Sequence, residues 1–476
     1  MKKDTHKQIR RGVILLFWLF IWQMAAVWTD NQILLAGPLQ VLQSLVENAA
    51  RPDFAVIVFG TFSRIGLGFL AAFLTGLLLG VVSYRRFLVE EILAPVMAVF
   101  KAVPVASFVV LLLIWFGSGR LSFWISFLIV FPSVYVNTVA GFRNTDRRLL
   151  EMADLYGICG WKRFLYLYRP ALMPCLNSCL RISLGMSWKS GVAAEIIGLP
   201  EFSLGERLYL SKIYLDTAGL FAWTMTIVLL SFCFEKAVLW LMQRFETWRP
   251  YPVWGIREEK AADRSAAGGA EEIRISHVDK SYKTQQVLCD FTFSMKKGGR
   301  YLMTAPSGAG KTTLLRVAAG LEEADRGTVT GMPPHIGMVF QEDRLCEDCD
   351  AICNILLGMH SKGSRRMRRE QLLDHVRMQA AKILPEECLT EPVRNLSGGM
   401  RRRVALLRAV LSGLPVLILD EPFTGLDEEN RVRSAEYLLR HQAGRILLVT
   451  THREEDVELL QGVRVTGTGS GLKKGT

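Results

Sequence analysis

The chain has 476 residues, of which 50% are hydrophobic and 21% are charged, and its net charge is +12. This length predicts two or three domains, and the composition excludes a disordered chain, a collagen and a small disulfide-bonded scaffold. Because the chain is more apolar than most soluble enzymes and more charged than a pure membrane bundle, we expect a membrane part joined to a soluble part.

Long apolar runs fill the first half of the chain, residues 1–245, which we expect to be a membrane domain. Each run approaches the ~20 residues that a spanning helix needs. We expect about six spans, at Gly12–Trp28, Ile65–Tyr84, Ile92–Phe116, Leu121–Phe142, Ala171–Ile197 and Thr217–Phe234. The first run follows five basic residues like a signal peptide, but its length and the lack of a small-residue cleavage site predict an uncleaved span.

Loop charges predict how these spans are oriented, because cytoplasmic loops are enriched in Lys and Arg. With the N-terminus inside, the inside segments carry Lys2, Lys3, Lys7, Arg10, Arg11, Arg85, Arg86, Arg143, Arg147, Arg148, Lys162, Arg163 and Arg169. The outside loops carry Arg51, Arg120, Arg207 and Lys212. We therefore expect a multi-pass protein of the cytoplasmic membrane with both termini in the cytoplasm. The lipid bilayer also explains much of the basic excess, so no nucleic acid partner is expected.

Residues 246–272 have the composition of a linker, with Pro250, Pro252 and an Ala/Gly/Glu run that stop helices and bury little. From Ile273 onward, short β-like runs such as "PVLILD" and "RILLVT" alternate with helical ones. Continuous apolar runs of this kind are typical of buried parallel strands. Residues 273–476 therefore predict a soluble α/β domain.

A phosphate-binding loop is the first chemical motif of this domain. "APSGAGKTT" follows a strand-like run and matches the P-loop pattern, with Ala305 in place of the first Gly. That β-carbon is tolerable only where φ is negative. The candidate phosphate-binding residues are Ser307, Gly308, Ala309, Gly310, Lys311, Thr312 and Thr313. Lys311 would neutralise the β- and γ-phosphates, and Thr312 would offer an oxygen to Mg²⁺.

Further motifs follow at the ends of other β-like runs. "VLILDEP" ends in Asp420, a candidate Mg²⁺ ligand through water, and Glu421, which is placed to activate water. Gln341 and His452 each follow an apolar run. Before a basic helix, "LSGGM" supplies Ser397, Gly398 and Gly399, which predict an anion site at a helix N-terminus.

In order and spacing these motifs resemble the ATP-binding cassette (ABC) family over about residues 271–460. The resemblance implies that Tyr282 stacks on adenine, that Gln341 joins Thr312 and Asp420 at Mg²⁺, and that His452 senses the γ-phosphate. It also implies a homodimer, because in this family each signature (here Ser397–Gly399) caps the nucleotide held by the other copy. Met400 in place of the commoner Gln looks like the nitrate/sulfonate/taurine branch, whereas the residues after Leu345 depart from it.

A second resemblance lies in the loop at about residues 143–170. Importer permeases carry an E-A-A-x3-G-x9-I-x-L-P segment, which Glu151, Gly157 and Pro170 match here. Three positions of the segment differ, Met152, Leu167 and Arg169. The match implies a short helix–turn–helix that docks on the ATPase. The alternative is an ordinary amphipathic loop.

Together the resemblances imply ATP-driven import of a small solute, served by a separate extracytoplasmic binding protein. Nitrate, a sulfonate, taurine or a vitamin precursor are the candidate solutes. Two other classes stay open: an exporter or membrane-signalling ATPase without a transported solute, and a non-hydrolysing scaffold, given Ala305. Stimulation of ATP hydrolysis by a ligand-loaded binding protein would separate the first class, and a phosphate-release assay would decide the second.

Three groups of residues have less specific interpretations. The run Arg365, Arg366, Arg368 and Arg369 predicts a solvated helical face rather than a nucleic-acid patch. Nine cysteines suggest reduced thiols. Cys346, Cys349 and Cys353, with Cys388, could hold a metal, but their spacing fits no familiar site and we expect inert thiols.

Four charges lie at nominal membrane depth, namely Lys101, Arg181, Lys189 and Glu195. They could line an anion path, snorkel to the interface or form structural pairs. Arg181 and Glu195 are fourteen residues apart, about 21 Å along a helix, so they cannot pair directly.

Overall fold

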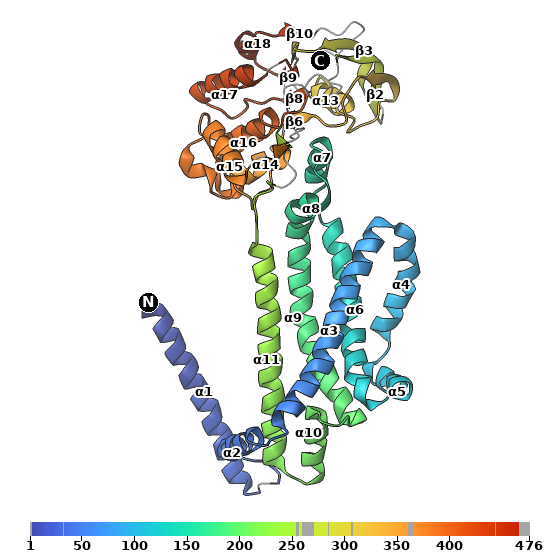
Figure 1. The fold of residues 1–476 in the computed structure, drawn as a ribbon, viewed down its shortest axis with the longest axis vertical. Coiled ribbons are helices and arrows are strands. Elements are labelled where there is room, and N and C mark those ends of the chain that lie inside the picture. Colours follow the sequence, from blue (N-terminus) through green and yellow to red (C-terminus); the bar gives the residue numbers. More distant parts are fainter. Residues whose placement is uncertain are drawn as a thin grey trace. The chain divides into compact units, whose positions relative to one another are not determined.

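The computed structural model describes residues 2–31, 33–253, 257–258, 271–283, 285–305, 308–359, 365–366, 368–442 and 444–465. It divides into two compact units (Figure 1). Unit 1 comprises Met1–Asn144 and Pro170–Trp248, and unit 2 comprises Thr145–Arg169 and Arg249–Thr476. Each unit is described by itself.

Unit 1 is helical throughout its described length. Its helices are α1 (Lys2–Thr29), α2 (Pro38–Ala49), α3 (Phe54–Arg85), α4 (Phe87–Ala102), α5 (Val105–Phe116), α6 (Ser118–Arg143), α9 (Arg169–Gly198), α10 (Leu204–Ile213) and α11 (Thr217–Thr247). Small residues let α3 and α6 approach closely: a β-carbon on Gly68 would lie 2.3 Å from the carbonyl oxygen of Phe123, and one on Gly80 would lie 2.6 Å from Thr138. Close packing over glycine is the usual way in which membrane helices associate.

The number of spanning helices is smaller than the sequence predicts. Four described helical segments are long and apolar enough to cross a membrane: Gly12–Thr29 of α1, α3, α6 and α11. The predicted span Ile92–Phe116 is instead two helices, α4 and α5, bent by 105° at a break, and counting the pair as one span gives five. Pro104 lies in that break, and proline lacks the N–H that a continuous helix needs.

The remaining predicted span, Ala171–Ile197, coincides with α9, which is 30 residues long. Because α9 contains polar and charged residues such as Arg181, it is not apolar enough to count as a membrane-spanning helix. The expectation of six spans is therefore corrected to four or five among the described residues.

Membrane orientation can be checked by thiol labelling. We expect single cysteines at Gly119 and Ser203 to react with an impermeant thiol reagent added outside, because these positions fall in the loops that carry few Lys and Arg residues. A cysteine at Arg147 should react only after the membrane is opened. Labelling of position 147 from outside would contradict the orientation.

Unit 2 is an α/β structure built on a five-stranded sheet, which confirms the predicted class. The sheet has the order β10-β4-β9-β8-β6, with β4 (Arg300–Thr304), β6 (Gly337–Val339), β8 (Val416–Asp420), β9 (Ile446–Thr451) and β10 (Val463–Arg464) all parallel. Every residue of β8 and β9 is buried, as the apolar runs predict. Because the strands are parallel, their carboxyl ends meet at one edge, where ligands of such sheets bind.

The other described strands of unit 2 lie in two smaller sheets. An antiparallel sheet has the order β3-β2-β5, formed by β2 (Glu272–Tyr282), β3 (Gln285–Lys296) and β5 (Arg326–Thr330). A third pairs β1 (Arg257–Glu258) with β7 (Arg365–Arg366). Arg365 and Arg366 are therefore in a strand and Arg369 begins a helix, so the expectation of one helical arginine face is wrong.

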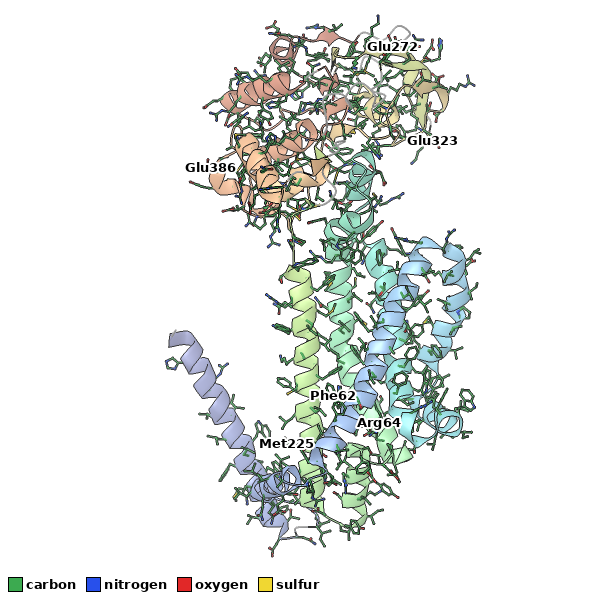
Figure 2. All side chains as sticks on the ribbon, in the orientation of Figure 1. Phe62, Arg64, Met225, Glu272, Glu323 and Glu386 are labelled. Carbon is green, nitrogen blue, oxygen red and sulfur yellow. The ribbon has the colours of Figure 1, made fainter. Side chains whose placement is uncertain are left out.

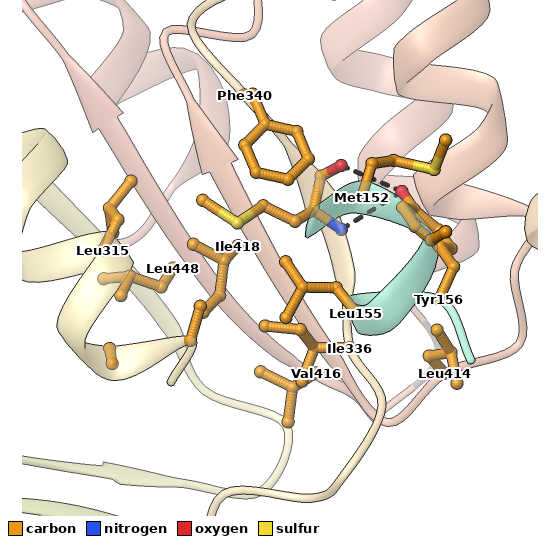
Figure 3. Packing of buried hydrophobic residues seen from close by; sticks show 14 of the residues in the cluster. Met152, Leu155, Tyr156, Leu315, Ile336, Phe340, Leu414, Val416, Ile418 and Leu448 are labelled. Carbon is orange, nitrogen blue, oxygen red and sulfur yellow. Dashed lines mark hydrogen bonds between the residues drawn. The ribbon is translucent and has the colours of Figure 1, made fainter. Parts of the chain in front are cut away.

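The helices of unit 2 include the segment that the sequence analysis assigns to the cytoplasmic loop. This segment forms α7 (Arg147–Leu155), α8 (Gly160–Arg163) and the π-helix η1 (Phe164–Tyr168). The others are α13 (Lys311–Ala318), α14 (Ala351–Gly358), α15 (Arg369–Ala380), α16 (Gly398–Val410), α17 (Glu428–His441) and α18 (Glu455–Leu460), with two short 3-10 turns, η2 (Glu386–Leu389) and η3 (Val393–Asn395). Met152, Leu155 and Tyr156 belong to the same buried cluster as Ile336 and Val416 (Figure 3).

Candidate functional site

The glycine-rich loop connects β4 to α13 at the carboxyl edge of the sheet. Gly308 and Gly310 have φ of +83° and +90°, which glycine adopts without strain. Lys311 is buried and its ammonium donates to the backbone oxygen of Ala305. Ala305 is not among the residues with positive φ, so its β-carbon is tolerated. The candidate Ser307 lies outside the described residues.

Asp420, at the end of β8, is held beside this loop. It is buried, and its two carboxylate oxygens accept hydrogen bonds from Thr312 Oγ1 at 2.9 Å and Thr450 Oγ1 at 2.6 Å. The structure thus brings together two of the three residues expected at Mg²⁺. A hydroxyl and a carboxylate are the oxygen donors that Mg²⁺ prefers, so these residues fit that ion.

Glu421 follows directly and has an unusual backbone, with φ of +47°. A positive φ is sparsely populated for a residue with a side chain and is commonly found at functional sites. The carboxylate oxygen Oε2 accepts a hydrogen bond from Thr424 Oγ1 at 3.2 Å and lies 3.6 Å from Nδ1 of His452. The two residues expected to act on water and γ-phosphate therefore meet at one point.

Arg402 ties the ends of two strands together, a role that the sequence analysis missed. Its buried guanidinium donates to the backbone oxygens of Phe340, Gln341, Asp420 and Glu421, and to Asp343 Oδ1 at 3.2 Å. Burial lowers the pKa of Arg402, which the charge of Asp343 partly offsets. The residue fixes the backbone on either side of Gln341 relative to Glu421.

The adenine candidate Tyr282 lies in β2, with 43% of its surface exposed. Its hydroxyl has hydrogen-bond contacts with Glu322 and Thr313, which place the ring beside α13. Burial and the contact with Glu322 raise its pKa. An exposed aromatic ring next to the phosphate loop is available for a base to stack on.

The signature residues lie at the start of α16. Ser397 caps this helix, its Oγ accepting from the backbone N–H of Met400 at 3.3 Å. A β-carbon on Gly398 would have no atom within 4 Å, so the backbone here is open. Within the described part of one chain, no hydrogen bond joins Ser397–Gly399 to Gly308–Thr313.

Glu151 of α7 connects two segments of the nucleotide site. Its carboxylate lies 3.3 Å from Arg316 of α13 and 2.8 Å from Arg344, which follows Gln341 by three residues. Burial alone would raise the pKa of Glu151, but hydrogen bonds from Arg316 and Arg344 outweigh it and hold the pKa below its usual value. The carboxylate therefore stays ionised at neutral pH.

Tyr156 anchors the end of α7 and is the second residue that sequence reasoning missed. It is fully buried, donates to the Met338 carbonyl oxygen at 2.9 Å and accepts from the Met338 N–H at 3.1 Å (Figure 3). The guanidinium of Arg408 lies 5.2 Å from its ring centroid. Tyr156 thus bonds to β6, the strand that leads into Gln341.

Gly157 makes the turn after α7 possible. Its φ is +58°, and a β-carbon there would lie 2.8 Å from the imidazole of His335. Both facts exclude ordinary side chains. Pro170, the last residue of the matched segment, is the first residue of the second stretch of unit 1.

Glu195, one of the four membrane-depth charges, has a structural partner. It is buried in α9 and lies 3.1 Å from Nε of Arg64, which Figure 2 labels on α3. Thr61 Oγ1 donates a hydrogen bond to it at 2.8 Å. Of the three interpretations given above for these charges, the structure therefore supports a structural ion pair for Glu195.

Cys346, Cys349 and Cys353 are buried, free thiols. Among the described residues, no group of three His, Cys, Asp or Glu side chains is arranged to hold a metal ion. A hydrogen bond to Cys349 and burial raise the pKa of Cys346, whereas hydrogen bonds with Cys346 and Cys353 lower the pKa of Cys349.

Inert thiols remain our prediction for this cluster. Replacing all three with Ser should leave ATP hydrolysis within about threefold, equivalent to about 0.65 kcal/mol of barrier. Stoichiometric metal in the purified protein, found by elemental analysis, would contradict the prediction.

Comparisons with known proteins match both halves of the chain. The family model "ABC transporter" matches residues 288–424, and "Binding-protein-dependent transport system inner membrane component" matches residues 55–247. A sulfate/thiosulfate import ATP-binding protein of Xanthomonas campestris is 36% identical over 218 residues, which are 41% of this chain and 62% of the relative. An aliphatic sulfonates import ATP-binding protein of Pseudomonas syringae is 35% identical over 204 residues, covering 42% of this chain and 81% of the relative. The solved dimer of a bacterial ABC transporter cassette is 25% identical, with a TM-score of 0.36 over 39% of this chain and 90% of the cassette.

Proposed function

Since the chain belongs to the ABC transporter family and joins an ABC ATPase domain to a binding-protein-dependent permease domain, we propose that it is the membrane subunit of an ATP-driven importer. The observation that carries the proposal is Glu151. This residue of the importer-type loop pairs with Arg316, at the end of the helix that starts at the phosphate loop, and with Arg344, just after Gln341.

Within the ATPase domain, each residue has a role that its position supports. The backbone around Gly308–Thr313 and the ammonium of Lys311 bind the phosphates, and Tyr282 stacks on adenine. Thr312, Asp420 and Gln341 hold Mg²⁺, which supplies positive charge to the phosphates. Glu421 accepts the proton of the attacking water, and His452 holds the γ-phosphate.

Two copies make the working unit. One chain carries one phosphate loop and one signature, and the open backbone at Gly398 is available to the nucleotide of a second copy. A separate extracytoplasmic binding protein delivers the solute, in keeping with the permease family. The charge bias of the loops supports a cytoplasmic-membrane protein with both termini inside.

The solute that we propose is a small sulfur oxyanion, a sulfonate or sulfate. Two similar ATPases are named for import of sulfate/thiosulfate and of aliphatic sulfonates. These solutes share a tetrahedral, negatively charged SO₃ or SO₄ group, so one kind of path would suit them all.

Phosphate release from the purified chain in proteoliposomes tests this function. We expect ATP hydrolysis that rises when a sulfonate-loaded binding protein is enclosed or added on the outer side. Absence of hydrolysis would favour the non-hydrolysing scaffold. Hydrolysis that no loaded binding protein stimulates would favour the exporter or signalling alternative.

A further inference from the structure

The outer face of α9 carries two cations that unit 1 leaves without partners. Arg181 and Lys189 are exposed, and among the described residues neither forms an ion pair or a hydrogen bond. With Gly185 between them they follow one ridge of the helix at four-residue spacing. A β-carbon on Gly185 would have nothing within 4 Å, so this ridge borders open space.

Arg181 also lines a groove of about 720 Å³ between α9 and α11. The other polar groups of the groove are Lys236 and Gln243 of α11, and Asn177, which donates to Glu246 at 2.9 Å. Trp240 adds an apolar surface. The lining therefore has two cations and one carboxylate, and that carboxylate already accepts a hydrogen bond.

The two cations of the groove, Arg181 and Lys236, lie well inside their helices. Arg181 is twelve residues from the start of α9, about 18 Å, and Lys236 is eleven residues from the end of α11, about 16 Å. Each helix is about 45 Å long and so extends beyond a ~30 Å bilayer core, and the groove reaches from these cations to Glu246, one residue before the end of α11. Lys236 also lies 5.1 Å from the ring centroid of Phe232, and charged residues of membrane helices usually face the bundle interior or a water-filled cavity.

We propose that this groove is the anion-selecting section of the permease path, and that Arg181 and Lys236 set its preference for a sulfonate or sulfate group. Lys189 lies about 12 Å further along the same ridge of α9 and adds positive charge beyond the groove. The guanidinium forms paired hydrogen bonds with such oxyanions, and an ammonium binds them as a point charge. Trp240 faces the same groove and can cover an alkyl chain, which separates sulfonates from sulfate. Glu195, another charge of α9, is not part of this groove, because it forms an ion pair with Arg64 inside the helix bundle. The inference rests on the import function proposed above.

Thiol labelling tests the proposal without requiring transport. The full chain with Gly185→Cys is placed in lipid nanodiscs, which leave both membrane faces accessible, and peptide mass spectrometry follows labelling of that position. The probes are an anionic methanethiosulfonate that bears a sulfonate and its cationic trimethylammonium counterpart. The measured quantity is the labelling rate of the anionic reagent divided by that of the cationic reagent. We expect this ratio to be higher at Gly185→Cys than for a free thiol in solution, because each nearby cation raises it about fivefold to tenfold.

Matched variants assign the preference to its residues. Added to Gly185→Cys, Arg181→Gln should lower the rate ratio about fivefold or more, whereas Arg181→Lys should keep it. Arg120→Gln, an exposed arginine at the start of α6, should leave the ratio unchanged. Leu74→Cys, on an exposed apolar face of α3, should react with neither reagent.

Three results would overturn the proposal. Failure of both Gly185→Cys and Ser178→Cys to react would show that the ridge faces lipid, and a ratio that Arg181→Gln does not change would show that these cations do not select anions. Millimolar ethanesulfonate should slow labelling of Gly185→Cys, and no protection would equally count against a binding section here. Since none of these readouts uses ATP, a failure here is distinct from a failure of the proposed import.

Discussion

Replacing Glu421 with Gln is expected to lower ATP hydrolysis about 10²–10⁴-fold, the usual cost of losing a general base. The amide keeps the size of the side chain and can still accept from Thr424, whose hydroxyl lies 3.2 Å from Oε2. ATP binding should persist, because it depends on the loop around Gly308–Lys311. Steady-state phosphate release and nucleotide binding, measured on the same preparation, check both parts.

A nearby carboxylate provides the control for this change. Glu429 is exposed in the first turn of α17. Glu429→Gln should leave the hydrolysis rate close to that of the unchanged chain. Near-normal hydrolysis in Glu421→Gln would exclude Glu421 as the base.

The second large effect is expected at the turn after α7. Gly157→Pro should reduce solute uptake by at least about tenfold while ATP binding remains. Proline fixes φ near −65°, whereas Gly157 has φ of +58°, and it removes the N–H that donates to Asp154 at 3.1 Å. Without this turn, Tyr156 and Glu151 cannot both keep their contacts with β6 and Arg344.

Uptake and hydrolysis measured together distinguish uncoupling from misfolding. Gly157→Pro should still hydrolyse ATP, but a loaded binding protein should no longer stimulate it. Glu151→Arg, which puts a third cation beside Arg316 and Arg344, should act in the same direction without disturbing the turn. Arg148→Gln is the matched control, because its exposed pair with Glu342 contributes about 1 kcal/mol or less. Normal uptake in Gly157→Pro would refute the docking role.

Local patterns in the sequence were sufficient to predict the strands of unit 2 at whose ends the proposed nucleotide-site residues lie. The run "VLILD" indicates a buried strand on its own, and a parallel sheet then brings Asp420, Gln341 and His452 to one edge. The α/β class and the helical membrane half followed in the same way. These fold predictions succeed because strand burial and helical hydropathy are encoded within a few neighbouring residues.

Arg402 and Tyr156 could not be predicted because their partners are distant in the chain. Arg402 bonds to carbonyls about 60 residues before it and about 19 after it, and Tyr156 bonds to Met338. Carbonyl partners leave no mark on the sequence. The helical pattern gave no signal for Arg402 either, because every residue of α16 from Arg402 to Val410 is buried.

The number of spans was overestimated for a different reason. Hydropathy treats Ile92–Phe116 as one run, whereas the structure breaks it at Pro104 into two helices bent by 105°, with Pro95 inside α4. In α9, the length of the helix favours a membrane span whereas its polar residues disfavour one. Only the tertiary structure shows that Glu195 is paired with Arg64 and that Arg181 lines a groove.

The central claim is that two copies of one chain, each with half of every nucleotide site, form the transporter. The most direct test is to count occluded ATP in the Glu421→Gln protein while measuring its mass in detergent. We predict a dimer with one ATP per chain, which Ser397→Arg abolishes by placing bulk and charge in the partner's site. Monomers that hydrolyse ATP near the normal rate would contradict both the assignment of Glu421 and the need for two copies.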